Sequence, residues 1–387
     1  MKTAVIGGGA AGLCAAVASR EKGDEVVLFE RMDRVGKKLL ATGNGRCNIM
    51  NTGPLRYNGG AAFAQRVLSV CSREALYGFL EKHGLALREE AQGRVYPATG
   101  QAATVLNVLL NAAVKAGVCI RTGMHVTTVG KYVNGTYSVF SEPFDKLIIC
   151  GGGKAQPRLG SDGSAHALLL SLGHPITALS PALVPLRADM AGLRGLSGLR
   201  VTADVFLEAQ GTEYGRETGE MLFTNDGLSG VCIMQLSRLY RPGACIRLDL
   251  RRAMNFMGED LLAYLAARRA SLPNADASGF LTGLFAEPVA RVIRERAGLL
   301  HLTDDALERL AHVLTHFTVP LMGTRGFNSA QVTAGGAELS FFNPDNLEST
   351  LHKHLHAAGE VLNVDGDCGG YNLMFAFCSG IAAARAG

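Results

Sequence analysis

Three glycines near the start of the chain, and an acidic residue after them, have types and spacing suited to holding phosphate groups. Gly7, Gly9 and Gly12 fit the pattern G-x-G-x-x-G. The first glycine permits a tight turn, the second lets the backbone approach a pyrophosphate, and the third lets a helix pack closely on a strand. Glu30 follows where a carboxylate can accept both hydroxyls of a ribose. This pattern predicts a dinucleotide site and favours NAD or FAD over NADP, because Glu30 would repel a 2′-phosphate.

The segments around these glycines predict the elements that must position them. Residues 1–6 predict a short buried strand, and residues 13–22 predict a helix with small residues on one face. Residues 26–29 form the continuous apolar run typical of a parallel strand covered on both faces. The helix N-terminus would direct free N–H groups and partial positive charge at the phosphates. This context separates the pattern from an ordinary glycine-rich turn.

A hairpin signal further along the chain favours FAD over NAD. Asn134 and Gly135, at the centre of residues 132–137, predict a type I′ turn, and residues 126–129 predict a strand before it. Residues 145–150 then form an apolar strand that ends at glycines. An antiparallel meander inserted into a parallel sheet is the arrangement of FAD domains of the glutathione-reductase type, which plain NAD domains lack.

The segment after Glu30 carries cations and glycines that suit the rest of such a cofactor. The lysines and arginines of residues 31–38 either offset the pyrophosphate charge or form a solvated helix face. Gly43 and Gly45 would let backbone amides approach the ribityl chain or the flavin ring, and Arg46 could stabilise negative charge on the reduced ring. Cys47 lacks the cysteine partner of flavin disulfide reductases, so a buried structural thiol is the favoured interpretation.

The C-terminal segment 359–373 provides a second signal of this kind. We predict a strand at residues 360–364, then an acidic glycine loop, then a helix whose N-terminus points at the flavin and favours negative charge there. Glu360 could hold a ribityl hydroxyl. Asp365 and Asp367 lack the remaining ligand positions of a calcium loop, so no metal site is predicted.

Composition limits the remaining function classes. The 387 residues are 48% hydrophobic with a formal charge of +4, and the basic residues are dispersed, which argues against disorder and against a nucleic-acid partner. The nine cysteines form no C-x-x-C pair, so a disulfide framework or a zinc site is not expected. Residues 4–18 are too short and too glycine-rich for a membrane span or a signal peptide. We therefore expect a cytoplasmic protein without a membrane partner.

The rest of the chain predicts an insertion. Residues 186–250 alternate apolar and polar, as in a small antiparallel sheet or barrel, and residues 259–317 have helical spacing with a capped start at Thr303. The predicted fold class is α/β, a glutathione-reductase-like FAD-binding Rossmann domain with an inserted antiparallel β-barrel and a small helical subdomain. The predicted limits are 1–185 and 323–387 for the two parts of the FAD domain, 186–255 for the barrel and 256–322 for the helices.

Five segments together resemble a known family: GGGAAG, GNGRCN, GEMLFTNDGLSG, VTAGG and GEVLNVDGDCGGYNL. They are similar to the bacterial FAD-dependent oxidoreductase family that includes aminoacetone oxidases and bile-acid (3-dehydro-bile acid) ene-reductases, and the resemblance runs from residue 1 to about residue 385. It implies the same split FAD domain, with flavin contacts from residues 42–48 and 369–373. The chain departs from the family pattern at residues 152–157, at Asn225 and at Met50, near the expected substrate side, so its substrate could differ.

The residues that we expect to contact the cofactor come from all of these segments. They are Gly7, Gly9, Ala10, Ala11, Gly12, Glu30, Arg31, Lys37, Lys38, Thr42, Gly43, Asn44, Gly45, Arg46, Cys47, Asn48, Val126, Gly151, Gly152, Glu360, Asp365, Gly369, Gly370, Tyr371, Asn372 and Leu373. The candidates for catalysis near the ring are Tyr371, Arg46 and Arg325, and the sequence does not choose among them.

The predicted activity is hydride transfer between FAD and a small, mostly apolar organic substrate. The preferred case is reduction of an activated C=C bond, as in a steroid- or bile-acid-like enone, with NAD(P)H as donor. Because the chain has a single convincing dinucleotide fingerprint, the nicotinamide would dock transiently. The alternatives are an O2-dependent oxidase of an amine or aminoketone, and a flavin-binding regulatory protein without catalysis. The sequence leaves the oligomeric state open.

Overall fold

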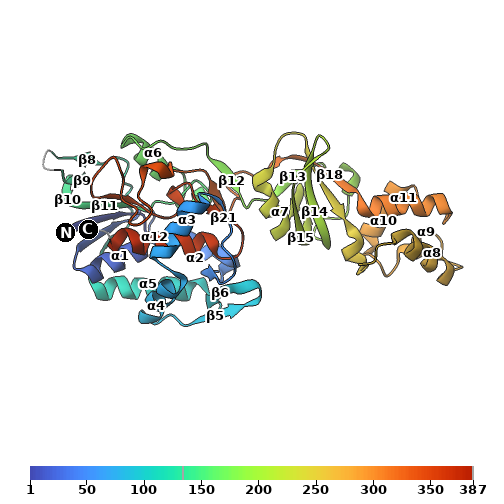
Figure 1. The fold of residues 1–387 in the computed structure, drawn as a ribbon, viewed down its shortest axis with the longest axis horizontal. Coiled ribbons are helices and arrows are strands. Elements are labelled where there is room, and N and C mark those ends of the chain that lie inside the picture. The colour runs from blue at the N-terminus through green and yellow to red at the C-terminus, as the bar shows by residue number, and fades with distance from the viewer. Residues whose placement is uncertain (133–134, 386–387) are drawn as a thin grey trace. The chain divides into compact units, whose positions relative to one another are not determined.

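The computed structural model describes residues 1–132 and 135–385, and it divides into two compact units (Figure 1). The first unit comprises Met1–Ala182 and Phe327–Gly387, and the second comprises Leu183–Gly326. Each unit has its own apolar core, which includes Phe29 and Phe144 in the first and Phe223 and Phe280 in the second. The domain limits drawn from the sequence stay a prediction, because compact packing does not show which segments fold independently.

A five-stranded parallel sheet forms the centre of the first unit. Its strands, in spatial order, are β20 (Leu355–Ala357), β11 (Lys146–Ile149), β1 (Lys2–Ile6), β2 (Glu25–Phe29) and β7 (Cys119–Arg121). The carboxyl ends of β2, β1 and β11 lie side by side, because Ile6 is in register with Phe29 and with Ile149. This edge is where ligands bind in open α/β sheets.

Helices cover this sheet, and two of them cross very closely. The helices of this unit are α1 (Ala10–Lys22), α2 (Lys37–Ala41), α3 (Ala61–Val70), α4 (Arg73–Lys82), α5 (Ala102–Ala116), α6 (Ser164–Ser171) and α12 (Tyr371–Arg385). Helices α1 and α5 pack against each other, and α12 packs on α1 (Figure 1). A Cβ added at Gly380 would lie 2.2 Å from the carbonyl oxygen of Ala11, so only glycine allows this crossing. The start of α12 is thereby fixed relative to the start of α1.

The predicted antiparallel meander is present but begins later than expected. It consists of β8 (Gly130–Lys131), β9 (Tyr137–Val139) and β10 (Glu142–Phe144). The expectation of a strand at residues 126–129 is wrong. Just before this segment Met124 N donates to Glu30 O, and Val126 then lines a pocket instead of pairing with a neighbouring strand. The predicted turn residues Val133 and Asn134 lie outside the described part of the chain.

Three small sheets complete the first unit. The largest is antiparallel and has the order β3 (Met50–Asn51), β6 (Arg94–Pro97), β5 (Leu87–Glu90). The other two pair β21 (Asp365–Gly366) with β4 (Tyr57–Gly59), and β12 (Ser180–Ala182) with β19 (Val332–Ala334).

The strand predicted at residues 360–364 is wrong, and a 3₁₀ turn at Gly359–Val361 takes its place. Its apolar side chains are buried, and its pairing is limited to an isolated bridge between Leu362 and Ala337. Gly359, with a φ of 78°, turns the chain at the start of this segment.

The second unit is a closed antiparallel barrel with helices inserted between two of its strands. The barrel order is β13 (Leu186–Ala188), β16 (Gly227–Ser229), β15 (Thr212–Thr224), β14 (Arg200–Ala209), β17 (Ala244–Asp249) and β18 (Phe317–Thr324). Its helices are α7 (Val231–Leu236), α8 (Leu261–Ser271), α9 (Ala277–Leu281), α10 (Glu287–Ala297) and α11 (Asp304–Thr315). The predicted cap at Thr303 is present, because its hydroxyl accepts from Ala306 N. The predicted fold class is confirmed.

No helix among residues 1–132 and 135–385 has both the length and the apolar composition needed to cross a bilayer.

Candidate functional site

The glycine turn between β1 and α1 leaves space in front of a helix that has no cap. A Cβ at Gly7 would lie 2.6 Å from Cys150 O, and one at Gly12 would lie 1.8 Å from Gly7 O, so the fold itself requires these two glycines. A Cβ added at Gly9, in contrast, would meet no heavy atom of the described chain within 4 Å, and no side chain caps α1. The first N–H groups of α1 are therefore available to an anion.

Glu30 is fixed at the mouth of this turn by backbone donors. Its Oε2 accepts from Gly8 N and its Oε1 accepts from Met32 N, both at 2.8 Å. The residue is only 8% exposed, yet it lines the pocket in front of the turn. A carboxylate oxygen can accept more than one hydrogen bond, so each oxygen retains acceptor capacity for a ribose hydroxyl.

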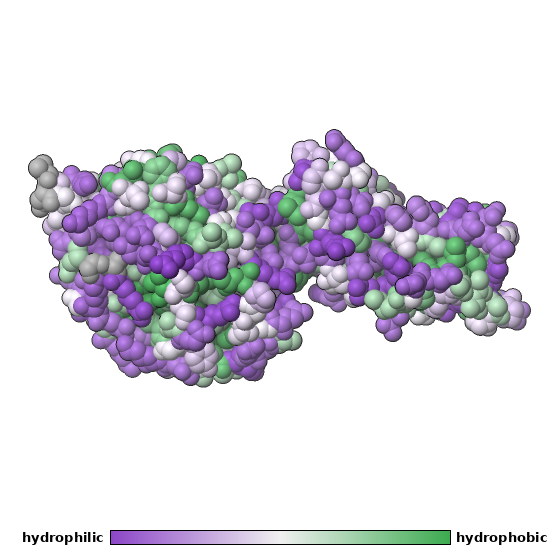
Figure 2. Space-filling model, in the orientation of Figure 1, coloured by the Kyte–Doolittle hydropathy of each residue, from purple (hydrophilic) through white to green (hydrophobic). Residues whose placement is uncertain are grey.

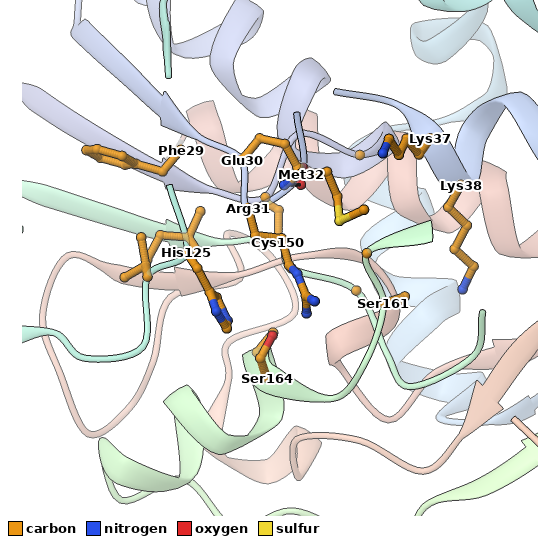
Figure 3. Close-up of a pocket in the computed structure, with 18 of the residues that line it drawn as sticks. Phe29, Glu30, Arg31, Met32, Lys37, Lys38, His125, Cys150, Ser161 and Ser164 are labelled. Atoms are coloured by element: carbon orange, nitrogen blue, oxygen red, sulfur yellow. Dashed lines mark hydrogen bonds between the residues drawn. The ribbon is translucent and has the colours of Figure 1, made fainter. Parts of the chain in front are cut away.

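A pocket at the carboxyl edge of the parallel sheet brings together residues from distant parts of the sequence (Figure 3). The predicted cofactor residues that line it are Gly7, Gly9, Glu30, Arg31, Lys37, Lys38, Val126, Gly151 and Gly152. Their cofactor-binding role stays a prediction. Figure 3 shows Arg31 and His125 directed to the same side of the pocket as Ser164. Arg31 pairs with Asp162 there, and hydrogen bonds from Arg31 and Ser164 outweigh burial to lower the pKa of Asp162 to about 2.

Sequence reasoning missed several lining residues. They include Phe29, Met32, Met124, His125, Cys150, Ser161 and Ser164. The run Gly-Ser-Asp-Gly-Ser at residues 160–164, which follows a glycine-rich strand end, was an available signal for the two serines. The hydroxyl of Ser161 is buried and has no hydrogen-bond partner in the described structure. A buried hydroxyl of this kind fits a polar ligand in the pocket.

Glu360 links four segments of the first unit and gives Lys38 a partner. Lys38 Nζ lies 2.6 Å from Glu360 Oε2, and Thr333 N donates to Glu360 Oε1 at 2.8 Å. The hydroxyl of Thr333 in turn accepts from Lys154 N at 2.7 Å. Lys37 instead pairs with Asp33 at 2.5 Å. Lys38 therefore takes part in a half-buried network at the pocket, whereas Lys37 forms a local ion pair with Asp33, which precedes α2.

The end of the loop at residues 42–48 and the strand β3 after it pack against the start of α12. The flavin contacts that the resemblance implied for these segments stay a prediction. A Cβ at Gly370 would lie 2.5 Å from Met50 O and 2.9 Å from Asn48 Oδ1. Asn51 Nδ2 donates to Gly369 O at 2.9 Å, which ties the two loops together. Asn48 Oδ1 is buried and lacks a partner among the residues described, so it could accept from a ligand N–H.

These features suit FAD at both of its ends. The uncapped α1 and Ser161 provide groups for a pyrophosphate and its surroundings, and Asn48 provides an acceptor for a ring N–H. Asn372 is an exception, since its amide is engaged by the backbone of Gly366 at 2.9 and 2.8 Å. Its side chain positions the loop, and a cofactor contact from this residue would have to come from its backbone.

The three candidates for catalysis do not belong to one unit. Tyr371 is buried at the start of α12, and this burial raises the pKa of its phenol, against the effect of the nearby Arg56. Arg46 lies over the ring of Tyr96 at 4.2 Å and pairs with Glu90. Arg325 belongs to the second unit. A catalytic role for each of these residues stays a prediction.

The Arg325 guanidinium is already paired within the barrel unit. Arg325 pairs with Asp226 and donates to the Thr224 hydroxyl at 2.9 Å.

Two thiols of the first unit, Cys47 and Cys150, are buried. Cys47 is buried, which raises its pKa to about 12, and burial likewise raises the pKa of Cys150. A thiolate at either position is disfavoured at neutral pH, in agreement with the interpretation of Cys47 as a structural thiol. Within the described residues, no group of three or more His, Cys, Asp or Glu side chains could hold a metal ion.

Comparison with known proteins gives full-length matches. The family model described as "HI0933-like protein Rossmann domain" matches residues 1–386. A 3-dehydro-bile acid delta(4,6)-reductase of Clostridium scindens is 34% identical over 99% of this chain and 98% of its own length. A ribosomal RNA dihydrouridine synthase of Escherichia coli is 28% identical over 98% of this chain and 96% of its own length.

Among solved structures, a flavocytochrome c3 fumarate reductase in its open conformation is 15% identical, with a TM-score of 0.49 over 99% of this chain and 77% of that chain. The chain described here belongs to the HI0933-like family and is an oxidoreductase with an FAD-binding Rossmann fold.

Proposed function

We propose that this oxidoreductase reduces a C=C bond conjugated to a carbonyl group on a small, mostly apolar substrate, with NAD(P)H as the donor. The observation that carries the proposal is the full-length similarity to a reductase of 3-dehydro-bile acids. The bound FAD would supply hydride transfer to the substrate. The residues that would hold it are the uncapped start of α1, Glu30 and the loops at residues 42–48 and 369–373.

Tyr371 is the side chain best suited to hold the proton that the reaction needs. The Tyr371 Oη carries a proton at neutral pH, since burial raises its pKa from the ordinary value of a tyrosine, which is already about 10, and this proton can pass to a substrate carbonyl oxygen or carbon. The Tyr57 hydroxyl donates to Tyr371 O at 2.9 Å, and the two rings meet edge to face at 6.1 Å. The first contact ties down the backbone at the start of α12, and the second packs the Tyr371 ring against Tyr57. Arg46, in the loop at residues 42–48, would add positive charge at the ring end of the site.

A second candidate function follows from the relative in Escherichia coli, which is named a ribosomal RNA dihydrouridine synthase. Dihydrouridine is uridine whose C5=C6 bond, conjugated to a carbonyl, has been reduced. The chemical step would thus be the same on a base of RNA. The sequence argued against a nucleic-acid partner, and this name reopens the question.

Anaerobic stopped-flow spectroscopy of the FAD-loaded protein tests the proposal. We expect NADH or NADPH to bleach the flavin absorbance near 450 nm, and a steroid enone to restore it faster than O2 does. Reoxidation by O2 together with peroxide formation from an amine, and by no enone, would instead establish the oxidase alternative. Reoxidation by a uridine-containing ribosomal RNA fragment alone would establish the second candidate.

Two tyrosine variants separate proton donation from positioning. Tyr371→Phe should lower kcat for the enone by about 10²- to 10⁴-fold, the usual contribution of a positioned acid. Reduction of the flavin by NAD(P)H should not change. The matched control Tyr57→Phe removes a neighbouring hydroxyl and should change kcat far less. Equal losses in both variants would remove Tyr371 as the proton donor.

A further inference from the structure

One face of the small sheet β3–β6–β5 gathers arginines whose function has not been assigned. In this sheet Glu90 is in register with Arg94, and Arg88 with Tyr96, so these four side chains share one face. Asn51, opposite Arg94 on β3, belongs to the same face. The alternate residues on these strands point the other way, and Val95 and Met50 are buried there.

Arg46 reaches the same face from the neighbouring loop and completes an arrangement around Glu90. Arg46 and Arg88 both donate to Glu90 Oε1, at 2.6 and 2.7 Å. Arg46 also lies over the Tyr96 ring at 4.2 Å. The hydrogen bond from Arg46 lowers the pKa of Glu90, so this carboxylate stays charged. We call Arg46, Arg88 and Arg94 the arginine face.

The arginine face carries more positive than negative charge and remains open to solvent. Three guanidinium groups stand against the single carboxylate of Glu90. The side chains of Arg46 and Arg88 are 40% and 50% exposed. Each guanidinium has five N–H donors, and the bonds to Glu90 use few of them. Figure 2 shows mostly hydrophilic surface where β5 and β6 lie in Figure 1.

The arginine face adjoins the end of the site that we assign to the flavin ring. Asn51, on the same face, donates to Gly369 O at the start of α12. Arg94 is close enough to Tyr371 to oppose the rise in the pKa of its phenol. A substrate whose double bond lies near Tyr371 would therefore extend over this sheet.

We infer that the arginine face binds a carboxylate on the substrate of the proposed reductase, on the part of the molecule that does not react. The inference rests on the proposed function and adds the charge of the substrate to it. A guanidinium fork matches the geometry of a carboxylate, and a brace such as Glu90 lowers the entropic cost of ordering two arginines. Arg88 and Arg94 are thus specificity-determining residues.

A carboxylate fits this face better than a nucleic-acid backbone does. RNA binding without base readout uses basic residues spread along several phosphates. The cations of the arginine face gather on one side of a three-stranded sheet, with Glu90 among them. Residues 183–326 contain as many acidic as basic residues and add no net charge. The arrangement suits one localised anion.

Paired substrates test the inference directly. They are a steroid enone with a side-chain carboxylate and its uncharged methyl ester. We expect the acid to have a KM about tenfold lower than the ester at low salt. In 1 M NaCl this difference should shrink, because the Debye length falls to about 3 Å. Equal KM values for acid and ester would overturn the inference.

Variants then assign the effect to residues. Arg88→Ala and Arg94→Ala should each raise KM for the acid about 10-fold or more, one lost charged hydrogen bond being worth about 1.5–3 kcal/mol. The KM for the ester should stay the same in both variants, kcat should stay the same in Arg88→Ala, and Arg88→Lys should recover part of the loss. Arg66→Ala is the control. It removes an exposed arginine of α3 that pairs with Asp345, and it should change neither KM. Equal losses for acid and ester would overturn the inference.

Binding without turnover separates this inference from the proposed function. Calorimetry with a saturated steroid carboxylate and its methyl ester requires no reduction. Tighter binding of the acid that depends on Arg88 supports the arginine face even if no enone is reduced. Turnover of both enones without discrimination retains the proposed function and ends the inference. An unstructured RNA that displaces the steroid acid at lower concentration, through Arg88, would show that the anion is a phosphodiester and overturn the carboxylate assignment.

Discussion

The glycine turn at residues 7–12 and the arginine face belong to the same unit but are built in opposite ways. The turn uses backbone groups held in place by backbone, since added Cβ atoms at Gly7 and Gly12 would strike carbonyl oxygens. The arginine face uses long side chains, of which the half-exposed Arg46 and Arg88 are held by the carboxylate of Glu90. A cofactor common to a family can be bound by rigid backbone such as the glycine turn. A substrate that differs between relatives needs side chains that can be exchanged without changing the fold, such as those of the arginine face.

The largest expected effect is at Gly12. A Cβ there would lie 1.8 Å from Gly7 O, an overlap with backbone that no rotamer relieves. Gly12→Val should therefore destabilise the first unit by more than about 3 kcal/mol, at the upper end of single substitutions. Absorbance at 450 nm and thermal unfolding measure the outcome. A yellow protein of normal stability would show that the turn is not rigid.

Gly9→Ala should separate cofactor binding from folding. The added Cβ meets no heavy atom of the described chain within 4 Å, and the φ of Gly9 is −83°, which alanine adopts without strain. The apoprotein should unfold at nearly the normal temperature. FAD affinity should fall about 10- to 100-fold, or about 1.4–2.8 kcal/mol, because the methyl group occupies the space expected for the pyrophosphate. A titration that gives an unchanged Kd would place the pyrophosphate elsewhere.

The same contrast explains what the sequence could predict. The glycine turn was predicted because backbone geometry dictates the residue types at Gly7 and Gly12. The arginine face was missed because it depends on the register between residues 87–90 and 94–97, whose sequences show little apolar alternation. The wrong strand at residues 360–364 has a related cause. Its apolar residues are buried in and after a 3₁₀ turn. A short apolar run does not by itself distinguish a strand from another buried segment.

Functional assignments from the sequence show the same contrast between residues positioned by the backbone and residues positioned by side-chain pairing. Glu30 and the glycines at residues 151–152 meet in one pocket because parallel strands end at one edge, which a sequence predicts well. Arg46 could be assigned to the ring end, but its pairing with Glu90 could not be foreseen, since the partner lies on another segment of similar polarity. Arg325, the third candidate for catalysis, lies in the barrel unit and pairs with Asp226.

A buried histidine in the parallel sheet provides a smaller, pH-dependent effect. His356 on β20 is 1% exposed, its Nδ1 lies 3.0 Å from Asn346 O, and burial together with Lys146 lowers its pKa to about 3. The unfolded chain binds this proton below about pH 6.5, while the folded chain binds it only near pH 3. The free energy of unfolding should therefore decrease as pH falls from 6.5 to 3, by about 1.4 kcal/mol per pH unit at most.

Urea unfolding at pH 7 and pH 4.5 checks this expectation. His356→Gln removes the titrating group, so the variant should lose less stability than the wild type between these two pH values. The comparison of the two proteins cancels the contribution of other titrating groups. An identical pH dependence in both proteins would show that His356 is protonated or exposed in the folded state.

The smallest effect is expected for the stability of the arginine face itself. Arg88 is half-exposed, and its partner Glu90 keeps the hydrogen bond from Arg46 when Arg88 is removed. Exposed ion pairs contribute about 0–1 kcal/mol, so Arg88→Ala should change the free energy of unfolding by less than about 1 kcal/mol. Urea unfolding measures this directly. A loss above about 2 kcal/mol would mean that the pair supports the sheet, and the division between a fixed cofactor turn and an exchangeable substrate face would fail. A neutral result leaves the charge of Arg88 free to act on a ligand.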